Sequence, residues 1–437
     1  MHGPGPRVLI LVENLSVPFD RRVWQECCAL TEAGYRVEVI CPRGTNRDTE
    51  PFAEIEGVRI HRYPLTAATG GPAGYAREYS LALWHTLRIA KRLSREEPFD
   101  VIHACNPPDL LFLIAMALRP TGARFLFDHH DLVPELFESR FAGGPRTLLR
   151  ASGLLERLTF WSADSVISTN ESYRQAAIAR GGFPPDRVRV VRSAPDLSRF
   201  VPVAPDPALK RGKPFLACYL GVMGPQDGVD YALRSLAHLH DELGREDLHA
   251  TFIGSGDAFD ESVALAHSLG LDGMVEFTGR VPDETVQAYL STADVCLSPD
   301  PKNPLNDVSS MNKVVEYMAM GRPLVSFELH EARVTAEDAA LYAPANDERR
   351  FAELIAELID DPERRERMGA IGRRRVQDAL SWDVSRGNLL AAYEDLLSRP
   401  LRRYEPAPVL DDAPVVTGEV ERRWAFPRLR RRAPAEF

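Results

Sequence analysis

The fold is decided by residues 293–327, which read ADVCLSPDPKNPLNDVSSMNKVVEYMAMGRPLVSF. Residues 295–298 form a short run of strand-forming side chains, 313–320 carry apolar residues at helical spacing, and 324–327 form a second short apolar run. A strand, a helix and another strand in this order predict a βαβ unit, in which the two strands lie parallel. The chain is therefore predicted to be an α/β protein.

The same alternation of strands and helices continues on both sides of this unit. It predicts further strands at 7–12, 36–40, 58–63, 101–103, 125–128, 165–168, 188–192, 215–221, 249–253 and 275–278. It predicts further helices at 21–33, 76–94, 110–118, 231–240, 259–269, 284–291 and 381–397. Residues 201–212, VPVAPDPALKRG, interrupt this rhythm with three prolines and few large apolar side chains, which is typical of an interdomain linker.

This interruption predicts two domains. We expect one Rossmann-like domain at 1–200, the linker at 201–212 and a second Rossmann-like domain at 213–380. A helical segment at 381–400 is expected to pack back across both domains, and 401–437 form a tail rich in proline and arginine. Because open α/β sheets bind ligands beyond the carboxyl ends of their strands, we expect the ligand site in the cleft between the domains.

Composition limits the ligand and the location. The 437 residues include 53 basic and 63 acidic side chains, a formal net charge of −10, which disfavours a general nucleic-acid binder. The longest purely apolar run, 110–118, is too short to span a bilayer. The six cysteines form no C-x-x-C pair, and the N-terminus does not resemble a signal peptide. We therefore expect a cytoplasmic location, with peripheral contact to the inner face of the cell membrane as the open alternative.

Two basic segments bear on that alternative. Residues 422–432, RRWAFPRLRRR, suit either an anchor to anionic lipid or a solvated tail. Residues 137–160 place four arginines among leucine and phenylalanine, which suits either a helix lying on a membrane or one packed in the core.

The helix start within the first quoted stretch has the chemistry of an anion site. Ser309, Ser310 and Asn312 are good helix caps. Lys313 then adds a positive charge in the first turn, where free backbone N–H groups and the helix dipole suit a pyrophosphate. One turn further on, Glu316 can accept hydrogen bonds from both hydroxyls of a ribose. A purely structural helix start has the same pattern. The surrounding motifs must therefore decide whether this helix start binds an anion.

Five motifs in order resemble the C-terminal half of glycosyltransferase family 4, a retaining family with the two-domain GT-B fold. They are GVMG at 221–224, GSGD at 254–257, FTGRVPDE at 277–284, ADVCLSP at 293–299 and EYMAMGRP at 316–323. The resemblance implies two Rossmann-like parallel-sheet domains that face an interdomain cleft. The N-terminal domain would bind the acceptor and the C-terminal domain the nucleotide-sugar donor.

The resemblance also implies roles for residues of the second domain. Glu316 matches the glutamate that holds the donor ribose, and Arg280 and Val281 fall where the family's loop meets the nucleobase. The remaining donor-binding residues belong to the glycine-rich turns and the helix start: Gly221, Met223, Gly224, Gly254, Ser309, Ser310, Met311 and Asn312.

The chain departs from the family pattern at two places. The family has an E-(seven residues)-E motif whose second glutamate Glu316 matches, and Val308, with Asp307 beside it, stands where the first glutamate is expected. Val222 and Asp227 replace the arginine and the lysine of the usual glycine-rich turn. Lys313 is the candidate for the missing positive charge and is taken as a catalytic group. This variant resembles bacterial O-antigen and capsule transferases that use UDP-linked acetamido sugars.

In the first domain, the segment DHHD at 128–131 follows a predicted strand. His130 and Asp131 match the family's His-Asp pair, in which the histidine approaches the transferring sugar, so both are expected to be catalytic. His129 is left undecided.

The loop after the first strand, ENLSVPFDRR at 13–22, would form the facing wall of the cleft. Asn14, Arg21 and Arg22 are candidates for contact with an acceptor phosphate or with the donor. The alternative for the arginines is surface charge at a helix start.

The resemblance thus implies a retaining glycosyltransferase that moves a sugar from a donor of the UDP-N-acetylhexosamine type to an acceptor hydroxyl. The expected acceptor is a lipid-linked glycan of cell-surface polysaccharide synthesis, and a soluble small molecule or natural product is the alternative. A non-catalytic nucleotide-sugar-binding subunit and a nucleotide-sugar epimerase are the rival functions. The sequence has no D-x-D pair, no H-E-x-x-H and no Cys/His cluster, so no metal is expected. The nucleotide sugar is a substrate, and no cofactor is expected.

Overall fold

The computed structural model describes residues 5–44, 47–65, 71–140, 146–195, 197 and 200–401. The chain divides into two compact units, Met1–Val191 with Arg386–Phe437 and Arg192–Ser385. Each unit contains one largely parallel sheet with helices packed on it. The prediction of two Rossmann-like parallel-sheet domains is therefore confirmed, and the cleft between them stays a prediction.

The first unit holds an eight-stranded sheet in the order β3-β4-β2-β1-β5-β6-β7-β8. Neighbouring strands are parallel except β3 and β4, which form an antiparallel pair at one edge. The strands are β1 (Arg7–Leu11), β2 (Arg36–Pro42), β3 (Phe52–Ile55), β4 (Val58–Tyr63), β5 (Val101–Cys105), β6 (Arg124–His129), β7 (Ser165–Ser168) and β8 (Val188–Val190).

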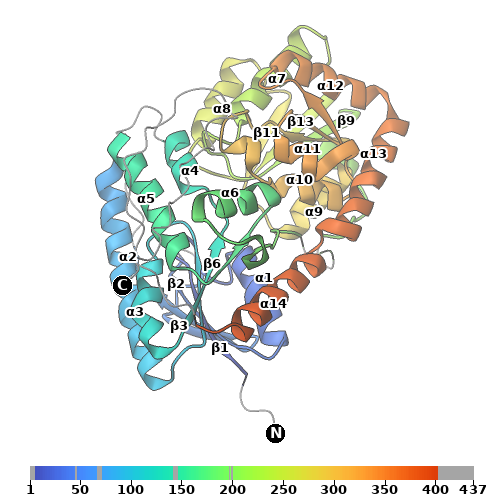
Figure 1. Ribbon diagram of the computed structural model, residues 1–437. Helices are drawn as coiled ribbons and strands as arrows, with labels where there is room; N and C mark the ends of the chain where they lie inside the picture. The colour runs from blue at the N-terminus through green and yellow to red at the C-terminus, as the bar shows by residue number, and fades with distance from the viewer. Residues whose placement is uncertain are drawn as a thin grey trace. The chain divides into compact units, whose positions relative to one another are not determined.

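Two groups of helices cover this sheet. In the first unit, α2, α3 and α5 lie on one face, and α1 and α14 lie on the other (Figure 1). Buried phenylalanines, among them Phe125, Phe127 and Phe160, fill the space under the first group. The helices are α1 (Arg21–Glu32), α2 (Gly71–Glu96), α3 (Phe112–Leu118), α4 (Val133–Arg140), α5 (Arg146–Ser162), α6 (Glu171–Gly181) and, from Arg386 onward, α14 (Trp382–Ser398).

The second unit holds a six-stranded parallel sheet in the order β11-β10-β9-β12-β13-β14. Its strands are β9 (Phe215–Leu220), β10 (Leu248–Ile253), β11 (Val275–Gly279), β12 (Val295–Ser298), β13 (Leu324–Phe327) and β14 (Ala340–Ala343). Its helices are α7 (Val229–Asp241), α8 (Phe259–Ser268), α9 (Asp283–Thr292), α10 (Asn312–Ala319), α11 (His330–Ala336), α12 (Glu348–Asp360) and α13 (Pro362–Arg375).

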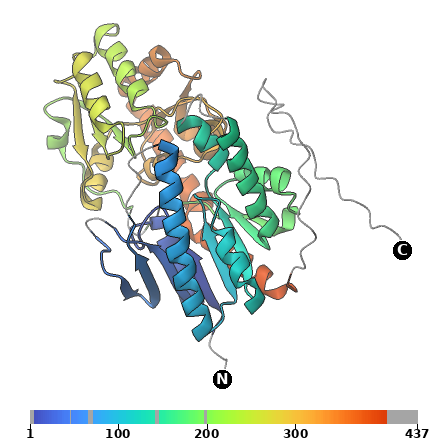
Figure 2. The same ribbon diagram turned by 90° about the vertical axis from the view of Figure 1, so that its left-hand side faces the viewer.

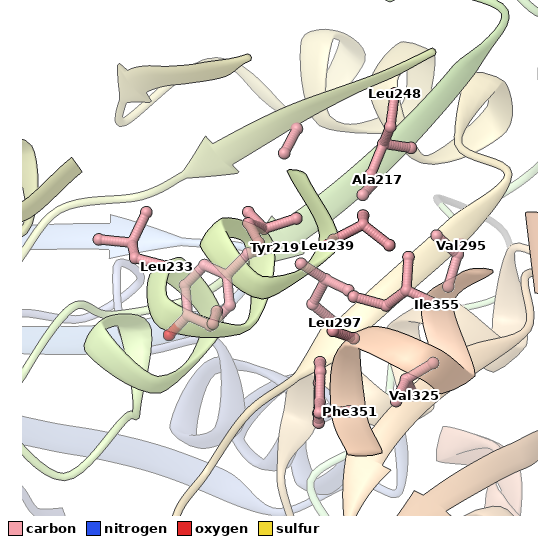
Figure 3. Close-up of a cluster of buried hydrophobic side chains, with 14 of the residues drawn as sticks. Ala217, Tyr219, Leu233, Leu239, Leu248, Val295, Leu297, Val325, Phe351 and Ile355 are labelled. Carbon is pink, nitrogen blue, oxygen red and sulfur yellow. The ribbon is translucent and has the colours of Figure 1, made fainter. Parts of the chain in front are cut away.

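Alternate side chains of the central strands of this sheet enter separate cores. Ala217 and Tyr219 of β9 point toward Leu233 of α7 and Phe351 of α12 in the core shown in Figure 3. The intervening residue Cys218 packs with α9 and α10 on the opposite face. Burial on both faces explains why these strands read as continuous apolar runs.

Several strands and helices were not predicted from the sequence. The prediction omitted the edge strands β3 and β14 and the helices α4, α6, α11, α12 and α13.

Residues 201–212 belong to the second unit, where Lys210 Nζ lies 2.8 Å from Asp294 Oδ2. Of the tail at 401–437, only Leu401 falls within the described residues, and the arginine-rich segment 422–432 lies outside them. In the part of the chain described here, no helix is long and apolar enough to cross a membrane.

Gly254 is a position where two backbones approach too closely for a side chain. It has φ +136°, and a Cβ atom there would lie 1.8 Å from the Gly221 carbonyl oxygen. Gly270 has φ +72° and nothing within 4 Å of such an atom. The two glycines therefore separate the effect of backbone conformation from that of steric overlap.

We expect Gly254→Ala to lower the free energy of unfolding by roughly 3 kcal/mol, because it adds overpacking to an unfavourable φ. Gly270→Ala should lower it by only about 1 kcal/mol. Urea unfolding followed by circular dichroism measures both values. Equal losses for the two variants would show that the close approach to Gly221 contributes nothing.

Candidate functional site

In the second unit, the strand order changes direction between β9 and β12, and ligands of open α/β sheets bind at such a point. The loop after β9 contains the glycine-rich turn, and the loop after β12 leads to α10. The predicted donor residues on these two loops lie at the same end of the sheet, because both loops follow the carboxyl ends of parallel strands.

A buried ion pair lies at this point. Lys313 Nζ is 2.5 Å from Asp300 Oδ1, and Ser298 Oγ donates to Asp300 Oδ2 at 2.8 Å. Burial lowers the pKa of Lys313, but the Asp300 carboxylate outweighs burial and raises it above its ordinary value. The ammonium is therefore charged at neutral pH, and it lies 5.2 Å from the centre of the Tyr219 ring.

The glycine-rich turn lies against this ion pair. A Cβ atom at Gly221 would come within 3.2 Å of Lys313 Cε, and one at Gly254 would overlap the Gly221 carbonyl. Met223 is buried, whereas Val222 is 54% exposed. The structure thus brings Gly221, Gly254 and Lys313 together, as a donor site built from these residues requires.

Asp227, which replaces the family's lysine, stabilises this turn. Its Oδ2 accepts a hydrogen bond from the Gly224 N–H at 2.9 Å. A lysine could not accept this bond, because an ammonium has no acceptor. The substitution therefore exchanges a positive charge for a closed turn, and Lys313 supplies a cation beside it.

Helix α10 begins differently from the prediction. Its first residue is Asn312, and its N-cap is Met311, whose side chain makes no capping hydrogen bond. The prediction that Ser309, Ser310 and Asn312 cap the helix is therefore wrong. Ser309 Oγ donates to Leu305 O at 2.7 Å, and the Ser310 hydroxyl donates to a glutamate of α11. An N-cap without a side-chain acceptor leaves the first turn suited to an external anion.

The other predicted donor residues differ in exposure. Glu316 follows Lys313 by one turn on α10 and is half-buried. Arg280 is exposed and Val281 half-buried in the turn between β11 and α9. Their contact with a nucleotide stays a prediction.

Sequence reasoning missed Asp300, Ser298 and Tyr219. The available signal was the S-P-D sequence that directly follows an apolar strand, since polar residues at strand ends face a ligand site in this class of fold. Nothing local identified Tyr219, which reads as an ordinary strand residue.

In the first unit, the Asp128 carboxylate at the end of β6 is the centre of a buried charge cluster. Arg22 Nε and Nη2 donate to its two oxygens at 2.9 and 2.8 Å, and His130 Nδ1 lies 3.2 Å from Oδ2. Arg22 Nη1 donates to Val191 O at 2.8 Å. The prediction that Arg22 contacts the acceptor is therefore corrected, because this guanidinium is buried and holds Asp128.

The contact with Asp128 decides the charge of His130. Burial lowers the pKa of this imidazole, but Asp128, aided by Asp131, raises it to about 9. His130 is therefore charged at neutral pH, with its side chain 13% exposed. Asn106, which sequence reasoning missed, fixes the turn: its Oδ1 accepts from the backbone N–H groups of His130 and Asp131, each at 3.0 Å.

His129 faces the opposite side of the sheet, because side chains alternate along a strand. It is fully buried among the rings of Phe127, Phe160 and Tyr173, whose centres lie 5.5, 5.0 and 5.6 Å from its own. Burial lowers the pKa of His129 to about 3. It is a neutral packing residue, which settles the role that the sequence left open.

Asn14 of the loop after β1 and Arg21, the first residue of α1, are exposed, so both are accessible to a ligand. Between strand and loop, Glu13 is only 4% exposed, and its Oε1 has no hydrogen-bond partner among the described residues. Burial and the nearby Glu78 raise the pKa of Glu13 to about 8, so it carries a proton at neutral pH. No sequence pattern indicated this protonated carboxyl group.

One buried group in the described part of the chain has the composition of a metal site. Glu26, His103, Cys105 and Asp128 place one ligand atom each within 4.8 Å of one another. Both Asp128 oxygens already accept from Arg22, and burial raises the pKa of the Cys105 thiol well above its ordinary value. A cation here would compete with a guanidinium and require a thiolate, so the residues do not fit a metal ion well.

Comparison with known proteins agrees with this architecture. A family described as "Glycosyl transferase 4-like domain" matches residues 20–194, and one described as "Glycosyl transferases group 1" matches residues 214–361. A sucrose-phosphate synthase from Thermosynechococcus elongatus has a similar structure, with a TM-score of 0.73 and 21% identity, over 90% of this chain and 99% of that chain.

Two relatives cover most of the chain. D-inositol 3-phosphate glycosyltransferase from Thermomonospora curvata is 30% identical over 395 residues, which are 83% of this chain and 87% of the relative. GDP-mannose-dependent alpha-(1-6)-phosphatidylinositol monomannoside mannosyltransferase from Mycobacterium tuberculosis is 24% identical over 364 residues, which are 80% of this chain and 87% of the relative. Together with the two parallel-sheet domains, these matches show that the chain belongs to glycosyltransferase family 4 and has the GT-B fold.

Proposed function

We propose that this chain transfers a sugar from a nucleotide diphosphate to an acceptor hydroxyl, and that the loops after β9 and β12 bind the donor. The buried pair of Lys313 and Asp300 carries this proposal. An acidic chain must concentrate positive potential at one place to hold a diphosphate. Here a charged ammonium, a glycine turn and the uncapped start of α10 are close together.

In the proposed reaction the sugar keeps its anomeric configuration. The bond from the anomeric carbon to the diphosphate breaks, the acceptor oxygen bonds to that carbon on the same face, and the hydroxyl proton passes to the leaving phosphate oxygen. Lys313 and the start of α10 stabilise the charge that develops on the diphosphate, and Asp300 positions the ammonium. Glu316 holds the ribose. This reaction needs no covalent nucleophile and no metal ion.

The chemical identities of the donor and of the acceptor are further parts of this proposal. The variant helix motif favours a UDP-linked acetamido sugar, whereas the relative from Mycobacterium tuberculosis is named as GDP-mannose-dependent, which favours GDP-mannose. The names of both relatives contain a phosphate-bearing inositol, soluble in one case and lipid-linked in the other. We therefore propose an acceptor that carries a phosphate group, with a lipid-linked glycan as the form expected for cell-surface polysaccharide synthesis.

The exposed face of α2 supports contact with an anionic membrane surface. In Figure 2 this helix runs along the near side of the first unit. Trp84 is 54% and Leu81 43% exposed, and the Arg88 guanidinium lies 5.5 Å from the centre of the Trp84 ring. The exposed residues at helical spacing on this face are Arg77, Leu81, Trp84, Arg88, Lys91, Arg92 and Arg95. A tryptophan among cations suits the headgroup region of an anionic bilayer.

The donor site predicts the effect of removing its buried charge pair. The double variant Asp300→Asn with Lys313→Met leaves no buried charge unpaired and should lower kcat about 100-fold, because an electrostatic contact to the leaving group is lost. Glu316→Ala should raise the donor KM about tenfold or more through the lost ribose contact. Transfer assays with UDP-, GDP- and dTDP-sugars, with the product identified by NMR, measure both effects.

Lys302→Met provides the matched control, because Lys302 is an exposed lysine of the same loop, with its side chain 41% exposed. The Lys302→Met variant should have the transfer activity of the wild type. Full activity and unchanged donor affinity in both site variants would place the donor elsewhere. Donor consumption that yields a stereoisomer without an acceptor would identify an epimerase instead.

The charge of His130 predicts an alkaline limit of activity. If the protonated ring is the form that meets the sugar, kcat/KM falls as pH rises through about 9, the pKa of this group. His130→Gln should be slower below that pH and should lack this limb. NMR titration of the ring checks the pKa directly, and a value below 7 would contradict a protonated His130 as the form that contacts the sugar.

The face of α2 predicts which substitutions weaken membrane binding. Trp84→Ala with Arg88→Glu should reduce binding to vesicles of phosphatidylcholine with phosphatidylglycerol by about tenfold or more, since each cation near the surface contributes about 1 kcal/mol. Arg374→Glu, an exposed arginine of α13, is the control and should bind as the wild type does. Deletion of residues 420–437 tests the tail independently. Equal binding by all variants would remove α2 from the proposal.

A further inference from the structure

A cavity of about 340 Å³ lies in the first unit at the amino ends of its strands, the edge opposite to the one that carries His130. Arg124, the first residue of β6, and Arg187, which directly precedes β8, line it from the sheet. Leu396 of α14 and Arg399, just after that helix, line it from the other side. The donor site proposed above lies in the second unit, so this cavity is separate from it.

The acidic residues around the cavity already have partners. Asp164, which also lines it, accepts two hydrogen bonds from Arg119, at 2.8 Å each, and one from the Phe125 N–H at 2.8 Å. Asp186 accepts from Arg399 Nη2 at 2.9 Å. Both carboxylates are therefore hydrogen-bonded to arginines other than Arg124 and Arg187, and Arg187 makes only a weaker electrostatic contribution at Asp186.

Two guanidinium groups at the cavity lack such a partner. Arg124 Nη2 donates to the backbone carbonyl of Arg399 at 3.0 Å, but its Nε is buried without a hydrogen-bond partner. The Arg187 guanidinium makes no hydrogen bond or ion pair with any residue that the structure describes. A buried N–H donor without an acceptor is destabilising, so Arg124 Nε favours an external anion, and the Arg187 guanidinium can bind the same anion.

We propose that this cavity binds a phosphate-bearing small molecule, with Arg124 and Arg187 as its ligands. Guanidinium groups present paired N–H donors that match the oxygens of a phosphate, and the bound anion satisfies Arg124 Nε. A volume of about 340 Å³ is within the range of small-molecule sites and exceeds what a single phosphate fills, so the class includes sugar phosphates and diphosphates. The apolar side chain of Leu396 gives such a ligand a surface beyond its phosphate.

Binding would also affect α14. The helix is held on the first unit by Tyr393, whose hydroxyl is 2.8 Å from His103 Nδ1, and by the ion pair of Asp395 with Arg189. An anion between the strand-edge arginines and Arg399 would add a further contact near the end of this helix. The ligand should therefore raise the thermal stability of the first unit.

The test is calorimetric titration of the full chain with inorganic pyrophosphate, in the wild type and in Arg187→Ala. The Arg187 side chain makes no hydrogen bond or ion pair with the described residues, so we expect its removal to leave the fold intact. The affinity of the cavity should fall about tenfold in Arg187→Ala, recover in part in Arg187→Lys, and stay unchanged in Arg150→Ala, an exposed arginine of α5.

The donor site also binds pyrophosphate if the proposed function is correct, so the two sites must be distinguished. The double variant Asp300→Asn with Lys313→Met removes the donor site and should leave the binding event that depends on Arg187. If pyrophosphate binding to the wild type shows no event that the double variant removes, the donor site is overturned and the cavity is not. If no binding event is weakened by Arg187→Ala, the cavity proposal is overturned and the donor site is not.

Two sources of the phosphate group are separated by a further comparison. Glycerol 3-phosphate in solution and vesicles containing phosphatidic acid are titrated in parallel with wild type and Arg187→Ala. A soluble ligand is supported if Arg187→Ala weakens the first, and a lipid headgroup if it weakens only the second. If neither is weakened, the cavity is not a phosphate site.

Discussion

Asp128 and Asp300 carry their carboxylates into the interior at or just beyond the carboxyl ends of parallel strands, where each must be paired. Asp128 is held by both sides of the Arg22 guanidinium and in turn keeps His130 charged. Asp300 keeps the buried ammonium of Lys313 charged beside the glycine turn. In both units a buried carboxylate therefore sets the charge of the residue proposed for catalysis.

This arrangement explains how an acidic chain can bind an acidic donor. The net charge of −10 is a property of the whole chain, whereas Lys313 and the start of α10 act over a short distance in a partly buried place. The glycine turn contributes by its lack of side chains, since a Cβ at Gly221 would press on Lys313. The family's cations at positions 222 and 227 of the turn are absent from this chain. Lys313 nevertheless provides a cation in the site.

The sequence was most informative where the signal is local. Strands β4, β7, β12 and β13 have the predicted ends, because short apolar runs bounded by turn residues need no knowledge of distant contacts. Prediction failed for Arg22, whose partner Asp128 lies 106 residues away in the chain. It also failed for the caps of α10, because Ser309 Oγ turns back to Leu305 O before the helix begins. The edge strand β3 was missed because its side chains are half exposed and show no apolar run.

The sequence by itself determined that this protein has two α/β domains of the family 4 type, since periodicity and ordered motifs are properties of the chain. It also identified Gly221, Lys313 and His130 as candidate site residues. Only the tertiary structure decided that His130 and not His129 faces the charged cluster, that Lys313 is paired with Asp300, and that Arg124 and Arg187 share a cavity. The physical reason is that the charge of a buried group depends on the partners that folding brings to it, and these come from strands far apart in sequence.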